Sequence, residues 1–185
     1  MKLIKFLIII FISLPSTIKA DLNENLTNKL KEGGKLIFIR HAIAPGGGDP
    51  ENFDINECNT QRNLDNNGRT QAKEIGNYLS SNNILIDKVI SSEWCRCKET
   101  ALLAFNKFET KSFLNSFYSS KFTKNKDRQI KELKMYIKNW ESKKNLVLVT
   151  HYVVISEMLD YNPSSGEIVI SDRNFKKLGN INIKY

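Results

Sequence analysis

The chain has 185 residues and a formal net charge of +8, and 41% of its residues are hydrophobic. This length suffices for one domain with a substantial core and argues against two. The positive charge could attract nucleic acid, but we recognise no nucleic-acid-binding motif, and the lysines of residues 121–144 are typical of a solvated helix face. We therefore expect no nucleic-acid partner, and a basic pocket for phosphorylated molecules explains the same charge.

The first twenty residues have the features of a secretory signal peptide. Lys2 and Lys5 precede the apolar run Phe6–Leu14, and a polar stretch ends at Ala20. The run is too short to span a bilayer, so we expect cleavage after Ala20, a periplasmic or secreted protein, and no stable membrane span in the mature chain. Because Ile18 is larger than ideal at the −3 position, an uncleaved membrane tether is the alternative.

The remaining residues, 21–185, are expected to form a single domain that begins with a helix and a buried strand. Asp21–Lys31 carries leucines at four-residue spacing, which predicts an amphipathic helix, and two glycines follow it. Leu36–Ile39 is an unbroken apolar run with β-branched residues, which predicts a strand buried on both faces. Arg40 and His41 end this strand. Taken alone, they could be a solvated arginine and a histidine in a turn.

A long loop follows this first strand. Residues 42–66 are rich in Gly, Pro, Asp and Asn, and structureless loops of that length are usually functional. We interpret this loop as the one that shapes the site for a ligand. Asp65 and the residues after it then offer N-cap chemistry for a helix that runs to about Ser80.

The rest of the chain alternates predicted strands with predicted helices. A strand over Lys88–Ser91 leads into a helix that begins near Glu93 and is expected to bury Ala101, Leu102 and Phe105. The later elements are a weaker third strand over Ser112–Asn115, a helix over Lys126–Trp140, a strand over Leu146–Thr150, a helix from His151, and an edge hairpin over Glu167–Ser171 and Phe175–Ile183. This alternation predicts an α/β fold with a mostly parallel sheet and helices on both faces.

Arginine and histidine side chains follow three of the predicted strands. His41 and His151, which are the two histidines of the chain, each come directly after a strand of buried type, and Arg96 follows the strand between them. In open α/β sheets, ligands bind at the carboxyl ends of the strands. We therefore expect these side chains to meet at one site. Packing alone does not explain why such residues follow three strands.

Three short motifs occur at these strand ends, namely Ile39-Arg40-His41-Ala42, Ser92-x3-Arg96-x3-Thr100-Ala101 and Val149-Thr150-His151. A fourth segment, Gln61-Arg62-Asn63-Leu64-x3-Gly68-x2-Gln71-Ala72, precedes and enters the first helix after the loop. Together they resemble the signatures of the histidine phosphatase (phosphoglycerate-mutase-like) superfamily, over roughly residues 36–158. The resemblance implies a three-layer α/β/α sandwich with a mostly parallel central sheet.

The resemblance also implies roles for these residues. His41 would be transiently phosphorylated, while Arg40, Arg96 and His151 hold the phosphoryl group. His41 must then be a neutral imidazole with one nitrogen held by a hydrogen bond and the other aimed at phosphorus. The guanidinium groups bind phosphate oxygens in pairs and supply positive charge, so we expect no metal and no other cofactor. Arg62 would either contact the phosphate or the substrate, or brace the loop.

The general acid that protonates the leaving oxygen is left open. Where mutase-like members carry a Glu after the third strand, this chain has Asn115 or Ser116, and Tyr152 stands where the acid-phosphatase branch has an Asp. None of these side chains can act as an acid near neutral pH. The carboxylates that could supply the proton are Asp49, Glu51, Asp54, Glu57 and Glu93.

These observations predict an exported phosphomonoesterase that works without a metal through a phosphohistidine at His41. Its substrate would be a phosphorylated small molecule or a phosphorylated component of the cell envelope. The alternative is a phospho-ligand-binding protein that keeps the pocket but is catalytically weak or inactive because the acid is missing. A third possibility, a basic interaction domain, predicts strongly salt-dependent binding that vanadate does not affect.

Three cysteines suit an exported protein. Cys95 and Cys97 flank Arg96, and Cys58 lies just before the Gln61-Arg62 segment. We predict a disulfide from Cys58 to either Cys95 or Cys97, which would fix the long loop over the site. Three free thiols are the alternative.

Overall fold

A six-stranded sheet forms the centre of the molecule in the computed structural model, which describes residues 17–185. The strand order is β3-β2-β4-β1-β5-β6. The strands are β1 (Leu36–Arg40), β2 (Ile86–Ser91), β3 (Glu109–Thr110), β4 (Asn145–Thr150), β5 (Ile168–Ser171) and β6 (Lys177–Ile181). The first four run parallel to one another, whereas β5 and β6 form the predicted antiparallel hairpin at one edge.

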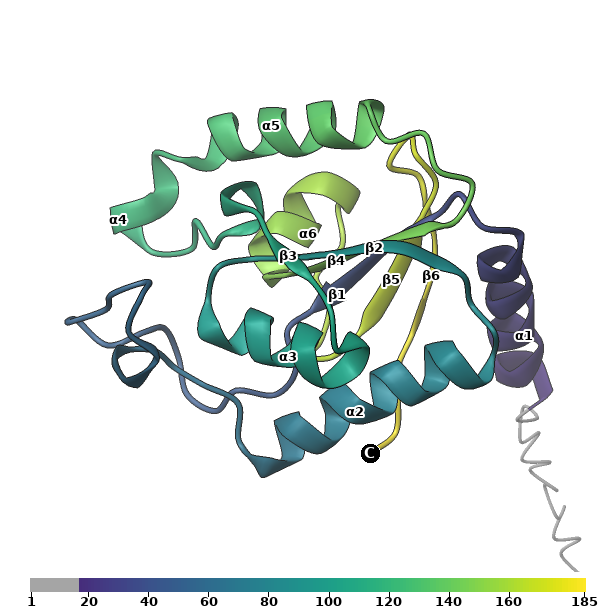
Figure 1. Cartoon of the computed structure of the whole chain (residues 1–185), viewed down its shortest axis with the longest axis horizontal. Helices are drawn as coiled ribbons and strands as arrows, with labels where there is room; N and C mark the ends of the chain where they lie inside the picture. The colour runs from purple at the N-terminus through teal and green to yellow at the C-terminus, as the bar shows by residue number, and fades with distance from the viewer. Residues whose placement is uncertain (1–16) are drawn as a thin grey trace, which may run out of the picture.

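Helices cover both faces of this sheet, which makes the three-layer α/β/α sandwich that was predicted (Figure 1). One face carries α1 (Thr17–Glu32), α2 (Asn66–Ser81) and α3 (Cys95–Phe105). The other face carries α5 (Lys126–Lys138) and α6 (Tyr152–Leu159). The shorter helices are η1 (Cys58–Thr60), η2 (Ser112–Leu114) and α4 (Ser120–Thr123).

The alternation of side chains along β1 divides the core in two. Leu36 and Phe38 pack into the cluster beneath α5 and α6, whereas Ile37 and Ile39 pack into the cluster beneath α1, α2 and α3. All four side chains are fully buried. A strand that is covered on both faces must be apolar throughout, which is why β1 appears in the sequence as an unbroken apolar run.

Two local predictions are wrong. Ser112–Asn115 is not a strand, because Phe113 and Leu114 enter the same core cluster, whereas consecutive strand residues would point to opposite faces. The segment forms the 3₁₀ turn η2, and the short strand β3 lies just before it. Leu102 is not buried either: its side chain is 51% exposed, since α3 turns its neighbour Ala101 toward the core instead.

The predicted signal peptide lies mostly outside the described residues. Residues 1–16 are not described, and the predicted cleavage point after Ala20 falls within α1. Leu26 and Leu30 of α1 are buried against the sheet, as expected for the amphipathic helix. Within residues 17–185, no helix combines the length and the apolar character that a membrane crossing requires.

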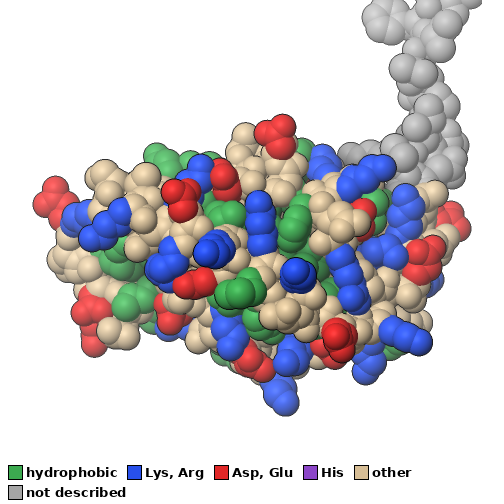
Figure 2. Space-filling model, turned by 90° about the horizontal axis from the view of Figure 1, so that it is seen from above, with side chains coloured by type: hydrophobic (Ala, Val, Ile, Leu, Met, Phe, Trp, Pro, Cys, Tyr) green, Lys and Arg blue, Asp and Glu red, His purple; other side chains and the backbone are tan. Residues whose placement is uncertain are grey.

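The lysine-rich region around α5 is a mixed surface. On this face of the molecule, basic side chains are interspersed with acidic and apolar ones and form no continuous patch (Figure 2). Arg128 pairs with Glu132 along α5, and Lys126 pairs with Glu157 of α6. This arrangement matches the solvated helix face predicted from the sequence.

Candidate active site

The carboxyl ends of three adjacent parallel strands bring the predicted residues together. In the register of β1 and β4, Arg40 lies opposite Thr150, so the next residues, His41 and His151, emerge side by side. The backbone N–H of His41 donates to the Thr150 carbonyl over 2.9 Å, and the two imidazole ring centroids are 5.5 Å apart. Ser92 follows β2 at the same edge, where its N–H donates to the Val149 carbonyl.

A cavity of about 440 Å³ opens at this edge. All five site residues predicted from the sequence line it, together with residues of the long loop and of the segment around α4. Its charged lining consists of four basic and two acidic side chains, which are Arg40, Arg62, Arg96, Lys121, Asp49 and Glu51. The cavity therefore has an excess of positive charge that suits an anionic ligand.

His41 is held as a neutral imidazole whose Nε2 carries the lone pair. Its ring is 2% exposed, with Nδ1 lying 2.8 Å from the Ala42 carbonyl oxygen. The Nε–H of Arg96 donates to His41 Nε2 over 3.2 Å, and because a guanidinium can only donate, Nδ1 must carry the imidazole proton. Burial, followed by the charge of Arg96, lowers the pKa of His41 well below its ordinary value. Its Nε2 is therefore unprotonated and can act as a nucleophile once it gives up the hydrogen bond from Arg96.

Motif residues outside the cavity lining hold the backbone beyond His41. The Thr100 hydroxyl accepts from the Ala42 N–H over 3.0 Å and donates to the Arg96 carbonyl over 2.7 Å. The amide oxygen of Gln71 accepts from the Ile43 N–H. These contacts tie the segment after β1 to α2 and α3, which explains why polar side chains recur in the motifs without facing a ligand.

A hydrogen-bond network fixes the protonation of His151. Its Nε2 lies 2.9 Å from Ser92 Oγ, and Ser92 in turn donates its single hydroxyl proton to the side-chain oxygen of Asn115. His151 Nε2 must therefore carry the ring proton and donate it to Ser92, which leaves the lone pair on Nδ1. Burial, followed by the charge of Arg96, lowers the pKa of His151 well below its ordinary value.

Arg40 and Arg62 each keep one buried donor without a partner. Arg40 donates through Nη1 to the Pro163 carbonyl over 2.9 Å, and Arg62 donates through Nη1 to the Ala44 carbonyl. The Nε–H group of each guanidinium is buried, and neither has a hydrogen-bond partner. Within the described part of the chain, these are the two buried side-chain atoms in that condition, and both belong to residues that line the cavity.

Asp49 is a site residue whose role sequence reasoning missed. Its carboxylate accepts from Arg96 Nη1 over 2.6 Å and from Arg96 Nη2 over 3.2 Å, and also from the Trp94 indole and the Arg62 backbone. Burial alone would raise the pKa of Asp49, but the hydrogen bonds and charge of Arg96 lower it below its ordinary value. Asp49 is thus ionised near neutral pH and cannot serve there as the general acid.

The other predicted acids are distinguished by their positions. Glu51 lines the cavity, whereas Asp54 and Glu57 lie farther along the loop and do not. Glu93 accepts from the Asn115 amide over 2.6 Å and also stands outside the lining. Ser116 does line the cavity but is not an acid. Glu51 is therefore the carboxylate at the cavity that no arginine holds.

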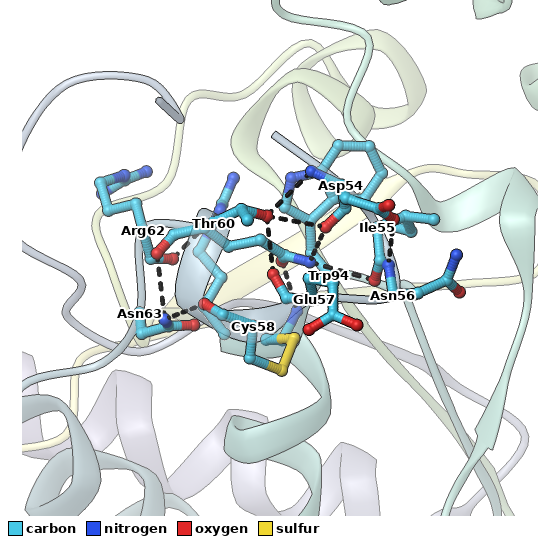
Figure 3. The surroundings of a disulfide bond; sticks show 12 residues. Asp54, Ile55, Asn56, Glu57, Cys58, Thr60, Arg62, Asn63 and Trp94 are labelled. Atoms are coloured by element: carbon cyan, nitrogen blue, oxygen red, sulfur yellow. Dashed lines mark hydrogen bonds between the residues drawn. A yellow bond between two sulfur atoms is a disulfide. The ribbon is translucent and has the colours of Figure 1, made fainter. Parts of the chain in front are cut away.

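The predicted disulfide is present, between Cys58 and Cys95, with the two Cα atoms 5.7 Å apart. Figure 3 shows how it joins the loop to the start of α3. Residues two apart on a helix point in nearly opposite directions. Cys97 therefore faces the core as a free thiol, with its sulfur 3.5 Å from His151 Nε2, and burial raises its pKa to about 12.

The described residues contain no candidate metal centre. Within residues 17–185, no group of three or more His, Cys, Asp or Glu side chains is arranged to hold a metal ion. The positive charge at the cavity is supplied by side chains, chiefly the three guanidinium groups.

Several solved structures share this architecture. The protein histidine phosphatase SixA, in complex with tungstate, superposes with a TM-score of 0.54 at 14% identity, over 80% of this chain and 96% of SixA. A protein from Thermus thermophilus, TTHB049, gives a TM-score of 0.56 at 16% identity, over 81% of this chain and 99% of its own. A putative alpha-ribazole-5'-P phosphatase from Escherichia coli gives 0.55 at 14% identity, over 74% and 89% of the two chains. This chain has the histidine phosphatase fold.

The sequence comparisons are narrower. The chain is 34% identical over 90 residues to the mitochondrial serine/threonine-protein phosphatase Pgam5 of Drosophila mojavensis. The match covers 49% of this chain but 27% of that relative, so the chain spans about a quarter of its length. No protein-family model matches the chain. The resemblance to the histidine phosphatase superfamily is thus confirmed by the fold and by this partial sequence match.

Proposed function

We propose that the protein is a phosphomonoesterase that works through a phosphohistidine at His41 and needs no metal. The observation that carries the proposal is the state of His41: a buried neutral imidazole whose proton is held on Nδ1 by the Ala42 carbonyl, with its Nε2 lone pair at a cavity lined by three arginines. Phosphoryl transfer requires an unprotonated nucleophile. It also requires preorganised positive charge around the phosphoryl oxygens.

The reaction would proceed in two balanced steps. His41 Nε2 attacks phosphorus, the bond from phosphorus to the ester oxygen breaks, and the alcohol leaves with a proton supplied by an acid. Water then attacks the phosphohistidine and gives a proton to the conjugate base of that acid, which releases inorganic phosphate and restores both the neutral imidazole and the acid. Arg40 and Arg96 would stabilise the equatorial oxygens in both steps, and the unpaired Nε–H groups of Arg40 and Arg62 are donors suited to the same anion.

His151 would contact the same phosphoryl group. Because its Nε2–H is committed to Ser92, the contact falls to Nδ1, which donates only after it gains a proton. A bound dianion favours that protonation, since an adjacent negative charge raises the pKa of an imidazole. His151 would then protonate as the substrate enters.

Glu51 is the proposed source of the proton for the leaving oxygen, since it is the cavity carboxylate that no arginine holds. Aryl phosphates have good leaving groups and need little help from an acid, whereas alkyl phosphates need much. Glu51→Gln should therefore slow the hydrolysis of an alkyl phosphate at least tenfold more than that of p-nitrophenyl phosphate, in line with the usual range for general acids. Equal effects on both substrates would remove Glu51 from this role.

The substrate and the location of the protein are also proposals. We infer that the protein is exported to the periplasm or secreted, and the Cys58–Cys95 disulfide supports an oxidising compartment. The substrate would be a phosphorylated small molecule or a phosphorylated envelope component. Two of the fold neighbours are named as phosphatases, one of protein histidine and one of a small molecule, and Pgam5 is named as a serine/threonine-protein phosphatase. The likeness therefore supports a phosphatase without choosing between these substrate classes.

The test is the hydrolysis of p-nitrophenyl phosphate by residues 21–185 in the presence of EDTA, with wild type beside His41→Ala. We expect wild-type turnover that EDTA does not reduce, and a loss of more than about a thousandfold in the variant, because the covalent step needs this nitrogen. Acid quenching during turnover should trap phosphate on wild type and none on the variant. Activity that survives in His41→Ala would exclude the phosphohistidine, and an inactive wild type that still binds phosphate would favour the phospho-ligand-binding alternative.

A further inference from the structure

The guanidinium of Arg96 has almost all of its donors in use. Its Nε donates to His41, Nη1 donates to Asp49 and to the Arg62 carbonyl, and Nη2 donates to Asp49. Four of its five N–H groups are thus in use. Arg40 and Arg62, by contrast, each keep a buried Nε–H without a partner. Arg96, which donates to the proposed nucleophile, therefore has fewer unused donors for a phosphate than Arg40 or Arg62.

The group that occupies Arg96 binds a guanidinium in the same way as a phosphate does. The Asp49 carboxylate lies against Nη1 and Nη2 with one oxygen on each, which is the bidentate pairing that a guanidinium also makes with two phosphate oxygens. A backbone N–H of Arg62 and the Trp94 indole N–H complete its surroundings. Asp49 lines the same cavity as both histidines, so an anion that pairs with Arg96 through Nη1 and Nη2 must use the same donors.

The backbone that carries Asp49 is rich in glycine and loosely packed. Gly46 and Gly48 adopt positive φ angles of 97° and 79°, a region in which glycine is far less restricted than other residues. A Cβ atom placed at Gly47 or at Gly48 would meet no heavy atom within 4 Å, so little packs against this stretch. The loop backbone can therefore shift, and withdrawal of the carboxylate frees the Trp94 indole N–H and the Arg62 N–H together with the donors of Arg96.

From these contacts we infer that Asp49 is an intramolecular competitor for the phosphate site, and that a phosphorylated ligand binds by displacing its carboxylate from Arg96. The inference rests on the proposed function in one respect, namely that the ligand carries a phosphate. In the free protein, Asp49 holds Arg96 in place and neutralises part of the charge of the cavity. When the ligand enters, Arg96 exchanges one bidentate anion for another. Asp49 thereby weakens the binding of every phosphate by the free energy needed to break its contact with Arg96.

The test measures the binding of inorganic phosphate rather than turnover, so it stands apart from the test of the phosphatase. Wild type, Asp49→Asn and Asp54→Asn are titrated calorimetrically with phosphate at constant ionic strength. Asp54 is the matched control, since it is an exposed aspartate of the same loop whose side chain caps the Asn56 N–H, a bond that asparagine preserves. Both variants remove one negative charge from the loop, so the effect of the net charge of the protein cancels in the comparison.

We expect Asp49→Asn to bind phosphate about tenfold more tightly than wild type, because the ligand no longer competes with a charged group, and Asp54→Asn to stay within about twofold. Unchanged binding in Asp49→Asn would overturn the inference. Weaker binding would also overturn it, because Asp49 would then act as a residue that positions Arg96 for the ligand. Undetectable binding in all three proteins would contradict it as well.

A second measurement needs no variant. In a crystal structure of the wild-type protein with tungstate, we expect the oxyanion on Arg96 Nη1 and Nη2 and both Asp49 oxygens beyond hydrogen-bond distance of them. Tungstate bound at the histidines while Asp49 keeps both contacts to Arg96 would overturn the inference. The phosphatase proposal would survive that result, since it depends on His41.

Discussion

The loop between β1 and α2 contains two segments that are held in opposite ways. The distal segment, residues 53–63, is fastened by the Cys58–Cys95 disulfide and by uncharged hydrogen bonds of Thr60, Gln61 and Asn63 (Figure 3). The proximal segment, residues 44–50, contains three consecutive glycines and is fastened chiefly by the charged Asp49–Arg96 contact. Both contribute residues to the same cavity, but the distal segment is fixed by a covalent bond and the proximal segment by a contact that another anion can replace.

The difference separates two tasks that one loop must perform. The distal segment places the aromatic ring of Phe53 against Trp94 at a centroid distance of 5.0 Å and so forms a fixed wall of the cavity. The proximal segment presents a charge that a ligand can replace. A substrate-shaping loop thus needs rigidity and freedom at different positions, and the following four changes test this division, from the largest expected effect to the smallest.

Loss of the disulfide should have the largest effect on stability. The Cys58→Ser/Cys95→Ser protein is expected to lose about 3–4 kcal/mol of unfolding free energy by the loop-entropy model, since the bond closes a separation of 37 residues. Urea denaturation with and without dithiothreitol measures this. Reductant should reproduce the loss in wild type and have no effect on the double variant. A reductant effect on both would mean that the disulfide is not its target.

Gln61→Leu should have the second largest effect. The Gln61 side chain donates to the carbonyls of Asp54 and Ile55 and accepts from the Cys95 N–H, so its replacement removes a hydrogen-bond partner from three backbone groups. We expect a loss of about 2–3 kcal/mol in urea denaturation. Gln61→Glu serves as the control because it keeps the acceptor, and should lose less. Equal losses would show that the bond from the Cys95 N–H to this acceptor contributes little.

The contact of the proximal segment should depend on pH, whereas those of the distal segment should not. The pKa of Asp49 is lowered in the folded protein, so its contribution to stability is present above its ordinary value of 3.8 and is lost as the pH falls through the folded value. Asp49→Asn is expected to cost about 1–2 kcal/mol at pH 7, by the usual strength of a hydrogen bond to a charged group. The difference from wild type in thermal unfolding should disappear at acidic pH. A difference that persists unchanged at pH 3 would show that charge is not what holds this segment.

Gly48→Ala should have the smallest effect, about 1 kcal/mol, because alanine is disfavoured at a φ of 79° although there is room for its methyl group. Gly47→Ala is the matched neighbour, since Gly47 has an open Cβ direction and is not among the positive-φ residues. Its cost should stay below about 0.5 kcal/mol. Equal costs, measured by thermal unfolding, would mean that backbone conformation at Gly48 does not constrain the segment.

Much of the fold and of the site could be predicted because each signal was local. The apolar runs of β1 and β4 and the charged residues that follow them are contiguous in sequence, and parallel strands bring such ends together. The strand predicted over Ser112–Asn115 failed because an apolar pair can bury itself in a turn as well as in a strand. The choice of Cys95 over Cys97 depended on where α3 begins, which the sequence did not settle.

The contact between Asp49 and Arg96 could not be predicted for a different reason. The two residues are far apart in sequence, and nothing local distinguishes Asp49 from Asp54 or from the other acids of the loop. Their pairing depends on the path of a flexible glycine segment across the cavity. One indirect signal for this pairing was present in the sequence. A buried arginine requires an anion, either a ligand or a residue of the chain itself.

The register of β1 against β4 has a consequence for how such a protein can change. His41 and His151 are placed by backbone hydrogen bonds between two central strands, whereas the walls of the cavity come from loops that the sheet does not need. Insertions or exchanges in residues 42–66 would alter which molecules fit and leave the distance between the imidazoles unchanged. The reaction and the choice of substrate can therefore evolve separately, with the sheet conserving the first and the loops diversifying the second.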